Sequence, residues 1–294
     1  MKIAMLHSRV RVEERLLCES FQAMGVEPDL IDVRECVFDL HEPGRWADYD
    51  AVLDRCLSQT GALAVVRVLE GWGVPVVNPS RVIETCGDKL ATSVALVRDG
   101  VPTPRTRIAV EDAAALRAVE ENGYPAVMKP VVGSWGRMLT RVNDRDAAEA
   151  IIEHKATLGG PHHSVYYVQE YVDKPGRDLR VFMVGDEAIC GIARRSAHWV
   201  TNTARGALAE RFNVSGEVAE IARRASRAVG GGVLAIDLLE HPVHGVMVNE
   251  VNHTMEFRNS IEPTGVDIPG RIARWVLEVA NGERQVIPTQ VVAS

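Results

Sequence analysis

Short apolar runs alternate with amphipathic stretches through the first eighty residues of the chain. Apolar runs bounded by polar or turn-forming residues are typical of buried strands, and a 3.6-residue apolar spacing is typical of helices. The runs predict strands over 2–7, 29–33, 51–56 and 75–78, and the spacing predicts helices over 12–25 and 61–72. This strand–helix order favours a parallel sheet. We therefore expect an N-terminal α/β domain over residues 1–85.

The same two patterns continue through the next eighty residues. Helices are predicted over 81–100, 111–123 and 144–158, and strands over 106–110, 125–131 and 138–142. Gly100 and the segment V-P-T-P at 101–104 end the first of these helices. The glycine-rich segment G-S-W-G-R at 133–137 separates the last two strands. We expect a central subdomain over 86–163.

The pattern becomes partly antiparallel from residue 164 onward. Gly185-Asp186 lies between two apolar runs and predicts a hairpin turn. Strands are also expected over 165–172, 233–240 and 245–252, and helices over 215–230 and 268–280. The first of these helices carries an apolar stripe of Val218, Ile221, Ala222, Ala225 and Val229. The fold class expected is thus α/β, with an α+β subdomain over 164–294.

Composition narrows the classes of partner and compartment. The 294 residues are 46% hydrophobic and 25% charged, with a net charge of −7. Such a charge gives no reason to expect nucleic acid or a membrane as the main partner, and we see no apolar run long enough to span a bilayer. The segment M-K-I-A-M-L-H is too soon interrupted by charge to predict a signal peptide. Five scattered cysteines without a C-x-x-C pair favour a reducing, cytoplasmic location.

Two carboxylates and an amide stand out within the last two predicted strands. Asp237 interrupts the apolar run V-L-A-I-D-L-L, where an unpaired charge would be costly. Glu250 and Asn252 are two positions apart in V-N-E-V-N, so they share one face of a strand. If the two strands pair, the three oxygen donors can converge, which suits Mg²⁺. The alternative is a salt bridge at the edge of a strand.

Lysines and a glycine-rich loop suggest anion binding elsewhere in the chain. Lys129 ends an apolar strand in V-M-K-P, and the loop at 133–137 follows four residues later. Such glycines let a backbone approach phosphate closely. The alternative is a plain hairpin turn with a solvated lysine. Lys89 in G-D-K, at a possible helix start, is equally ambiguous by itself.

A connector and four arginines complete the candidate chemistry. The segment Q-E-Y-V at 169–172 ends a strand and leads into an extended linker. Arg180, Arg194, Arg195 and Arg205 follow within a short span, and arginine binds carboxylate and phosphate through two parallel hydrogen bonds. Taken singly, each arginine is better explained as a surface charge.

The order of these segments resembles the ATP-grasp superfamily over nearly the whole chain. The matching set is Lys89, M-K-P with Lys129, G-S-W-G-R, Q-E-Y-V, D-L-R with Arg180, Asp237 and N-E-V-N. It is closest to the RimK-like branch. The strings at 194–206, 248–260 and 264–270 look like the LysX family, which joins α-aminoadipate to the carrier protein LysW. Asn259-Ser260 is similar to the aminoadipate-type motif, and the glutamate-specific ArgX relatives carry Gly-Phe there.

The resemblance implies ATP and Mg²⁺ as cofactors and assigns roles to particular residues. Metal ligands would be Asp237, Glu250 and Asn252. Nucleotide contacts would come from Lys89, Lys129, Gly133, Ser134, Trp135, Gly136, Arg137, Gln169, Glu170, Tyr171, Val172, Asp178, Arg180 and Asn202. Catalytic arginines would be Arg180, Arg194 and Arg205. Substrate contacts would come from Arg194, Thr203, Ala204, Glu256, Phe257, Arg258, Asn259 and Ser260.

The implied reaction is an ATP-dependent ligation through an acyl phosphate. The γ-phosphoryl group would pass to the C-terminal glutamate of a small acidic LysW-like carrier, and the amine of α-aminoadipate would displace phosphate. Glutamate as the amino acid, or RimK-like glutamate addition to a ribosomal protein, are alternatives within the family. A nucleotide-binding interaction module without catalysis is an alternative from another class. The family also suggests a homo-oligomer.

Overall fold

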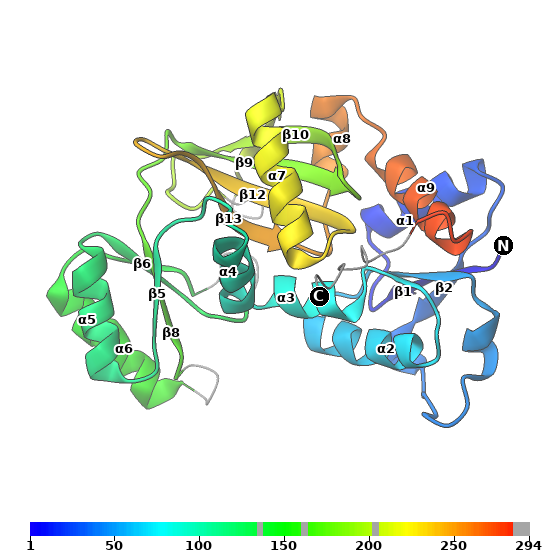
Figure 1. The fold of residues 1–294 in the computed structure, drawn as a ribbon, viewed down its shortest axis with the longest axis horizontal. Coiled ribbons are helices and arrows are strands. Elements are labelled where there is room, and N and C mark those ends of the chain that lie inside the picture. The colour runs from blue at the N-terminus through cyan, green and yellow to red at the C-terminus, as the bar shows by residue number, and fades with distance from the viewer. Residues whose placement is uncertain (134–137, 160–163, 202–205, 285–294) are drawn as a thin grey trace, which may run out of the picture.

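The computed structural model describes residues 1–133, 138–159, 164–201 and 206–284. Three sheets follow one another across the molecule, and the five-stranded sheet lies between the two four-stranded ones (Figure 1). Parallel strands with covering helices come first, and antiparallel strands dominate afterwards. The predicted α/β class with an α+β C-terminal part is confirmed.

The first sheet is parallel, in the order β2-β1-β3-β4. Its strands are β1 (Ile3–His7), β2 (Asp29–Asp32), β3 (Ala51–Asp54) and β4 (Val76–Val77). The helices are α1 (Val12–Ala23) and α2 (Gln59–Gly71), and two short 3₁₀ helices cover Val33–Glu35 and Gly44–Asp48. Carboxyl ends of parallel strands lie at one edge of a sheet, so the loops after His7 and Asp54 lie near each other.

The second sheet is antiparallel, in the order β5-β8-β6-β7. It consists of β5 (Thr106–Ala109), β6 (Ala126–Lys129), β7 (Thr140–Val142) and β8 (Tyr166–Glu170), with helices α5 (Asp112–Asn122) and α6 (Arg145–Leu158). Both helices bury their apolar residues against this sheet. Strand β8 lies after position 163, the predicted end of the central subdomain, but it pairs with β5 and β6, which lie before that position. The division of the chain at 85 and 163 stays a prediction.

The third sheet has five antiparallel strands in the order β11-β10-β9-β12-β13. These are β9 (Arg177–Val184), β10 (Glu187–Arg195), β11 (Leu208–Phe212), β12 (Val233–His241) and β13 (Gly245–Asn252). The turn expected at Gly185-Asp186 joins β9 to β10, and Gly185 has a φ of +58°, which glycine adopts readily. Helix α7 (Gly216–Val229) buries the whole predicted apolar stripe against the sheet. Helices α8 (Arg258–Thr264) and α9 (Ile268–Ala280) follow β13.

The helix predicted over 81–100 is wrong in one respect, because two helices occupy it. Helix α3 (Ser80–Gly87) and helix α4 (Lys89–Arg98) meet at Asp88. The Asp88 carboxylate accepts a hydrogen bond from the Ala91 N–H at 2.9 Å and begins α4. The Lys89 N–H donates to the Val131 carbonyl at 2.9 Å. The chain therefore bends at Asp88 to meet the segment that follows β6.

The first and third sheets share one hydrophobic core. Residues from β1 and α1, such as Met5 and Leu17, pack in the same cluster as Phe182 of β9 and Val276 of α9. Helices α1 and α9 lie side by side in Figure 1. Burial of this shared apolar surface holds the parallel sheet against the sheet that carries Asp237.

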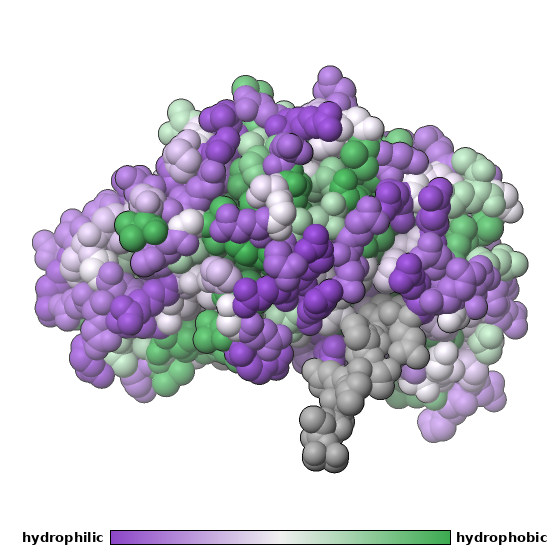
Figure 2. Space-filling model, turned by 45° about the horizontal axis from the view of Figure 1, so that its top comes forward, coloured by the Kyte–Doolittle hydropathy of each residue, from purple (hydrophilic) through white to green (hydrophobic). Residues whose placement is uncertain are grey.

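The outer surface is mainly polar. Figure 2 shows hydrophilic residues over most of one face, with apolar residues in smaller groups between them. Within the described parts of the chain, no helix is both long and apolar enough to cross a membrane.

Candidate active site

A β-bulge arranges the acidic residues of β13. Asp237 on β12 lies opposite Glu250, whereas its neighbour Leu238 lies opposite Val248, so Asn249 is an extra residue in β13. A bulge turns successive side chains away from strict alternation. Asn249 and Glu250 consequently line the same cavity, while Val248 and Val251 both pack in the core against α7.

Asp237 is buried and held by two arginines. Arg180 Nε and Nη2 donate to its two carboxylate oxygens at 2.7 and 2.8 Å, and Arg194 Nη2 lies 3.2 Å from Oδ2. Burial alone would raise the pKa of Asp237, but the two guanidinium groups outweigh it and lower the pKa to about 2. Asn252 Nδ2 donates to Asp237 Oδ2 at 3.4 Å. The three predicted metal ligands therefore converge in space.

The donor set fits a hard divalent cation. Asp237 is ionised, Glu250 is partly exposed beside it, and Asn252 contributes an amide, so oxygen atoms are available from three side chains. The described residues contain no group of three or more His, Cys, Asp or Glu side chains placed for a metal. The asparagine is therefore needed to complete a set of three.

Two lysines approach Glu250 from the second sheet and from α4. Lys129 at the end of β6 is buried and donates to Asn249 Oδ1 at 2.8 Å. Burial lowers the pKa of Lys129 to about 8, against the opposing effect of Glu250. Lys89 Nζ donates to the Gly133 carbonyl at 2.6 Å and lies 3.4 Å from Glu250 Oε1. Both ammonium groups thus lie beside the candidate metal ligands.

Two cavities meet at Asp237 and Glu250. The connector cavity, of about 110 Å³, lies between the second and third sheets. All four residues of the segment Gln169, Glu170, Tyr171 and Val172 line it, as do Lys129, Asp178 and Arg194. The N-terminal cavity, of about 390 Å³, is lined by Arg180, Asn252 and Gly133 on one side and by residues of the first 60 positions on the other. Asp237 and Glu250 line both cavities.

Asp178 organises the wall of the connector cavity. Its carboxylate accepts hydrogen bonds from Arg194 Nε and Nη2 at 2.6 and 2.9 Å, and from the Thr201 hydroxyl. Lys174 Nζ lies 3.7 Å from the same carboxylate and donates to Thr201 Oγ1 at 2.6 Å. Arg194 therefore links Asp178 to Asp237 in a buried ion-pair chain.

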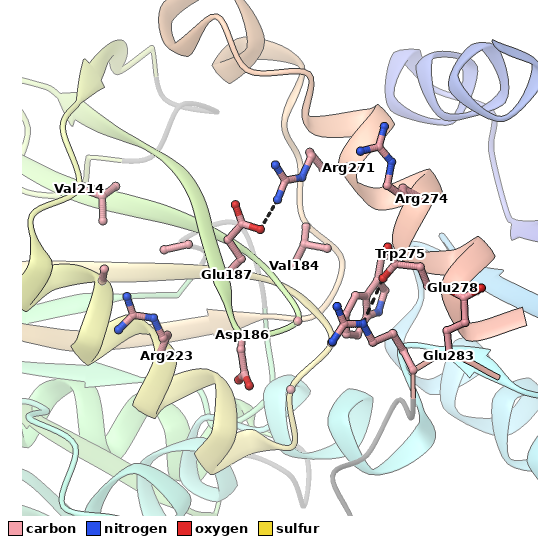
Figure 3. A pocket seen from close by; sticks show the side chains of 16 residues that line it. Val184, Asp186, Glu187, Val214, Arg223, Arg271, Arg274, Trp275, Glu278 and Glu283 are labelled. Atoms are coloured by element: carbon pink, nitrogen blue, oxygen red, sulfur yellow. Dashed lines mark hydrogen bonds and ion pairs between the residues drawn. The ribbon is translucent and has the colours of Figure 1, made fainter. Parts of the chain in front are cut away.

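A third cavity, larger than these two, lies elsewhere among the described residues, between the β9–β10 turn, α7 and α9 (Figure 3). It measures about 860 Å³ and shares no lining residue with the two cavities at Asp237. Arg271 points to Glu187 and forms an ion pair with it, as the dashed line in Figure 3 marks. Arg284 pairs in the same way with Glu278 at 3.2 Å. These opposite charges offset each other, so the lining gives no preference for an anionic ligand.

Several predicted residues do not line the two cavities that meet at Asp237. Of the segment 256–260, Glu256 lines the N-terminal cavity, Phe257 lies fully buried in the core, and Ser260 is buried in α8. Arg258 and Asn259 are exposed on α8. Lys89 lines neither cavity, although its ammonium group lies 3.4 Å from Glu250 Oε1. Eight further predicted residues lie outside the described parts of the chain: Ser134, Trp135, Gly136, Arg137, Asn202, Thr203, Ala204 and Arg205.

Other cavity residues were not predicted from the sequence. Asn249 and Lys174 line the connector cavity, and Arg11 and Thr254 line the N-terminal cavity. Asn249 is the first residue of N-E-V-N and could have been included with that motif. Arg11 is far from the motif in sequence, and only the packing of the first sheet brings it to the cavity.

Comparison with protein families identifies the chain. Residues 3–85 match the LysX preATP-grasp domain, and residues 86–276 match the RimK-like ATP-grasp domain. The chain belongs to the RimK-like ATP-grasp family. As a member of this family it is an ATP-grasp ligase, and such ligases bind ATP.

Three proteins similar to this RimK-like ligase match it over almost their whole length. The glutamate–LysW ligase ArgX of Sulfurisphaera tokodaii is 34% identical, over 95% of this chain and 99% of the relative. The α-aminoadipate–LysW ligase LysX of Saccharolobus solfataricus is 33% identical, over 90% and 98%. The crystal structure of a RimK domain ATP-grasp protein from Sphaerobacter thermophilus superposes with a TM-score of 0.79 at 30% identity, over 94% and 100% of the two chains.

Proposed function

We propose that this ligase joins the amino group of α-aminoadipate to the C-terminal glutamate carboxylate of a small acidic LysW-like carrier protein. The reaction would consume ATP and proceed through an acyl phosphate. ADP and phosphate would be released. Relatives named as LysW ligases, similar over almost the whole chain, support the carrier as partner.

The meeting of two cavities at Asp237 and Glu250 is the observation that carries this proposal. A phosphoryl transfer needs donor and acceptor on either side of the transferred group. Nucleotide in the connector cavity would direct its terminal phosphate toward Glu250, and the acceptor carboxylate would reach the same point from the N-terminal cavity. Positioning of this kind contributes much of the rate in such reactions.

The nucleotide would lie in the connector cavity. Gln169, Glu170, Tyr171 and Val172 would border the base, since the segment lines the cavity beside apolar Val127 and Leu239. Lys89 and Lys129 would contact phosphate oxygens, because both ammonium groups lie beside Glu250. The loop 133–137 would cover the phosphates, and Asp178 and Asn202 would complete the nucleotide contacts.

Mg²⁺ would be held by Asp237, Glu250 and Asn252. When bound there, the ion would offset the charge of the phosphate oxygens. Asp237 is already ionised and tied to Arg180 and Arg194, so a cation would share this carboxylate with the guanidinium groups.

The arginines would handle charge on the acceptor side. Arg180 lines the N-terminal cavity next to Asp237, where it would contact the acyl phosphate, with Arg205 assisting. Arg194 is buried between Asp178 and Asp237, so we assign it to fixing the carboxylates and bordering the substrate. The attacking amine forms the new C–N bond as the C–O bond to phosphate breaks.

Glutamate is the second candidate for the amino acid, since ArgX and LysX relatives show nearly equal identity. Asn259-Ser260 favours α-aminoadipate by its similarity to the aminoadipate-type motif. Thr203, Ala204 and residues 256–260 are the proposed substrate contacts, and of the last five only Glu256 lines the N-terminal cavity. Subunits are expected to form a homo-oligomer in the cytoplasm.

The test mixes purified enzyme, Mg-ATP and a LysW-like carrier ending in glutamate with α-aminoadipate, glutamate and other amino acids. Intact mass of the carrier identifies the residue added. A mass gain with α-aminoadipate supports the proposal, and a gain with glutamate alone replaces the amino acid assigned. No gain with any amino acid, despite bound ATP, contradicts the ligase assignment to this carrier.

A further inference from the structure

The N-terminal cavity has a second charged pair besides the residues around Asp237. Arg11, just before α1, and Glu256, just after β13, both line the cavity. Arg11 Nη1 donates to Glu256 Oε1 at 3.1 Å. The ion pair therefore joins the first sheet's loop to the segment that follows the candidate metal strand.

The Arg11 guanidinium is held in place by the buried carboxylate of Glu14. Glu14 is fully buried and accepts from Arg11 Nη2 at 2.8 Å and from Nε at 3.0 Å. Arg55, also buried, donates from Nε to Glu14 at 3.1 Å and from Nη1 to the Met255 carbonyl at 3.1 Å. Because Glu14 holds the Nε–Nη2 edge of the Arg11 guanidinium, the Nη1 group is left to face Glu256 and the cavity.

Glu256 is a less firmly held partner than Glu14. Its side chain is 35% exposed, against 0% for Glu14, and one of its oxygens meets Arg11. Burial raises the pKa of Glu256, against the opposing charge of Arg11. A ligand that carries both a carboxylate and an ammonium group can break such an ion pair. Its carboxylate then pairs with the fixed cation, and its ammonium group pairs with the partly exposed carboxylate.

We propose that Arg11 binds a carboxylate of the incoming amino acid, displacing Glu256, whose own carboxylate then faces the ammonium group of that amino acid. This assignment rests on the proposed function and names a recognition residue in the first sheet's loop. The ligand class is an acidic amino acid. Its other carboxylate would lie toward Arg180, which lines the same cavity.

The experiment compares wild type with Arg11→Gln, with Arg11→Lys, and with Arg9→Gln as a matched control at an exposed arginine two residues away. Calorimetric titration of the Mg-ADP-loaded enzyme uses α-aminoadipate, glutamate, glutamine and glutamate α-amide. Binding is measured without the carrier, so failure of carrier ligation and failure of this inference give separate results. Thermal unfolding and ADP affinity check that each variant is folded.

We expect wild type and Arg9→Gln to bind the acidic amino acids more tightly than one of the two amides, glutamine or glutamate α-amide. In Arg11→Gln that preference should fall by about 10- to 100-fold, as for the loss of a charged hydrogen bond. Arg11→Lys should lose less, because it keeps the positive charge at this position. If Arg11→Gln no longer distinguishes glutamate from glutamine, Arg11 binds the side-chain carboxylate. If it no longer distinguishes glutamate from glutamate α-amide, Arg11 binds the α-carboxylate. Unchanged discrimination in both variants, or equal weakening for acids and amides, would overturn the proposal.

Discussion

Lys129 Nζ donates a hydrogen bond to Asn249 Oδ1 at 2.8 Å, across the connector cavity from one sheet to another. Lys129 ends β6 of the second sheet, and Asn249 is the bulged residue of β13 in the third. A regular strand would have turned Asn249 to the face opposite Glu250. The bulge thus supplies the buried lysine with a neutral acceptor beside the carboxylate that we assign to the metal.

Asn249 is expected to position Lys129 for phosphate. Asn249→Leu keeps a similar volume but removes the acceptor, at a cost of about 1.5–3 kcal/mol for a hydrogen bond to a charged group. We predict that kcat/KM for ATP falls roughly 10- to 150-fold. KM for the amino acid should stay near that of wild type, which is the internal control. An unchanged kcat/KM for ATP would show that Lys129 needs no such acceptor.

Binding of ATP should weaken at alkaline pH. Burial lowers the pKa of Lys129 to about 8 in the unliganded enzyme. The protonated form attracts phosphate, so its contribution is present below pH 8 and is lost as pH rises through that value. We predict that kcat/KM for ATP declines above about pH 8, since this parameter reports groups of the free enzyme.

The matched variant for this pH effect is Lys129→Arg. Arginine stays charged throughout the range, so the decline near pH 8 should disappear even if the overall rate is lower. A decline that persists unchanged in Lys129→Arg would assign the titration to another group.

Local patterns predicted the regular elements well. Helix α9 spans the expected residues 268–280, and the hairpin forms at Gly185-Asp186, where a turn residue with positive φ is needed. The face shared by Glu250 and Asn252 also followed from the two-residue period of a strand. These features depend on neighbours in sequence, so their signals are present in the chain itself.

Features that depend on distant segments were not predictable in this way. The break at Asp88 arises where Lys89 meets the carbonyl of Val131, more than forty residues away. The bulge at Asn249 inserts one residue without changing the hydrophobic pattern enough to reveal it. The pairing of Asp237 with Arg180 and Arg194 likewise needs the register of three strands. Tertiary contacts, rather than local propensity, decide each of these.

Two carboxylate substitutions should separate metal binding from stability. Glu250→Gln removes one proposed ligand charge from a side chain that is 30% exposed, so the fold should tolerate it. Asp237→Asn leaves Arg180 and Arg194 without their shared buried carboxylate. Breaking such a buried pair typically costs about 3–5 kcal/mol.

We therefore predict that both variants lose ADP formation, whereas only Asp237→Asn lowers the thermal unfolding midpoint by several degrees. A rising Mg²⁺ concentration should partly restore Glu250→Gln, because a weakened site needs more ion to fill it. Near-normal ADP formation by Glu250→Gln at low Mg²⁺ would remove Glu250 from the proposed metal set.

Asn78 ties the first sheet to the third, and its loss should destabilise the whole molecule. The side chain is 3% exposed; its Nδ2 donates to the carbonyls of Val233 and His253 at 2.8 and 2.7 Å, and its Oδ1 accepts from the Val233 N–H at 2.8 Å. Asn78→Ala removes three hydrogen bonds to backbone groups, two of them buried and one part-buried, each at a cost of about 1–3 kcal/mol. We predict a loss of roughly 3–5 kcal/mol in the free energy of unfolding, measured with denaturant. The loss is smaller than the sum of the three costs, because water that enters the site can bond some of these backbone groups. Asn213→Ala, at an exposed loop position, is the control and should change stability by less than about 0.5 kcal/mol. Equal stability of the two variants would mean that these three hydrogen bonds do not hold the sheets together.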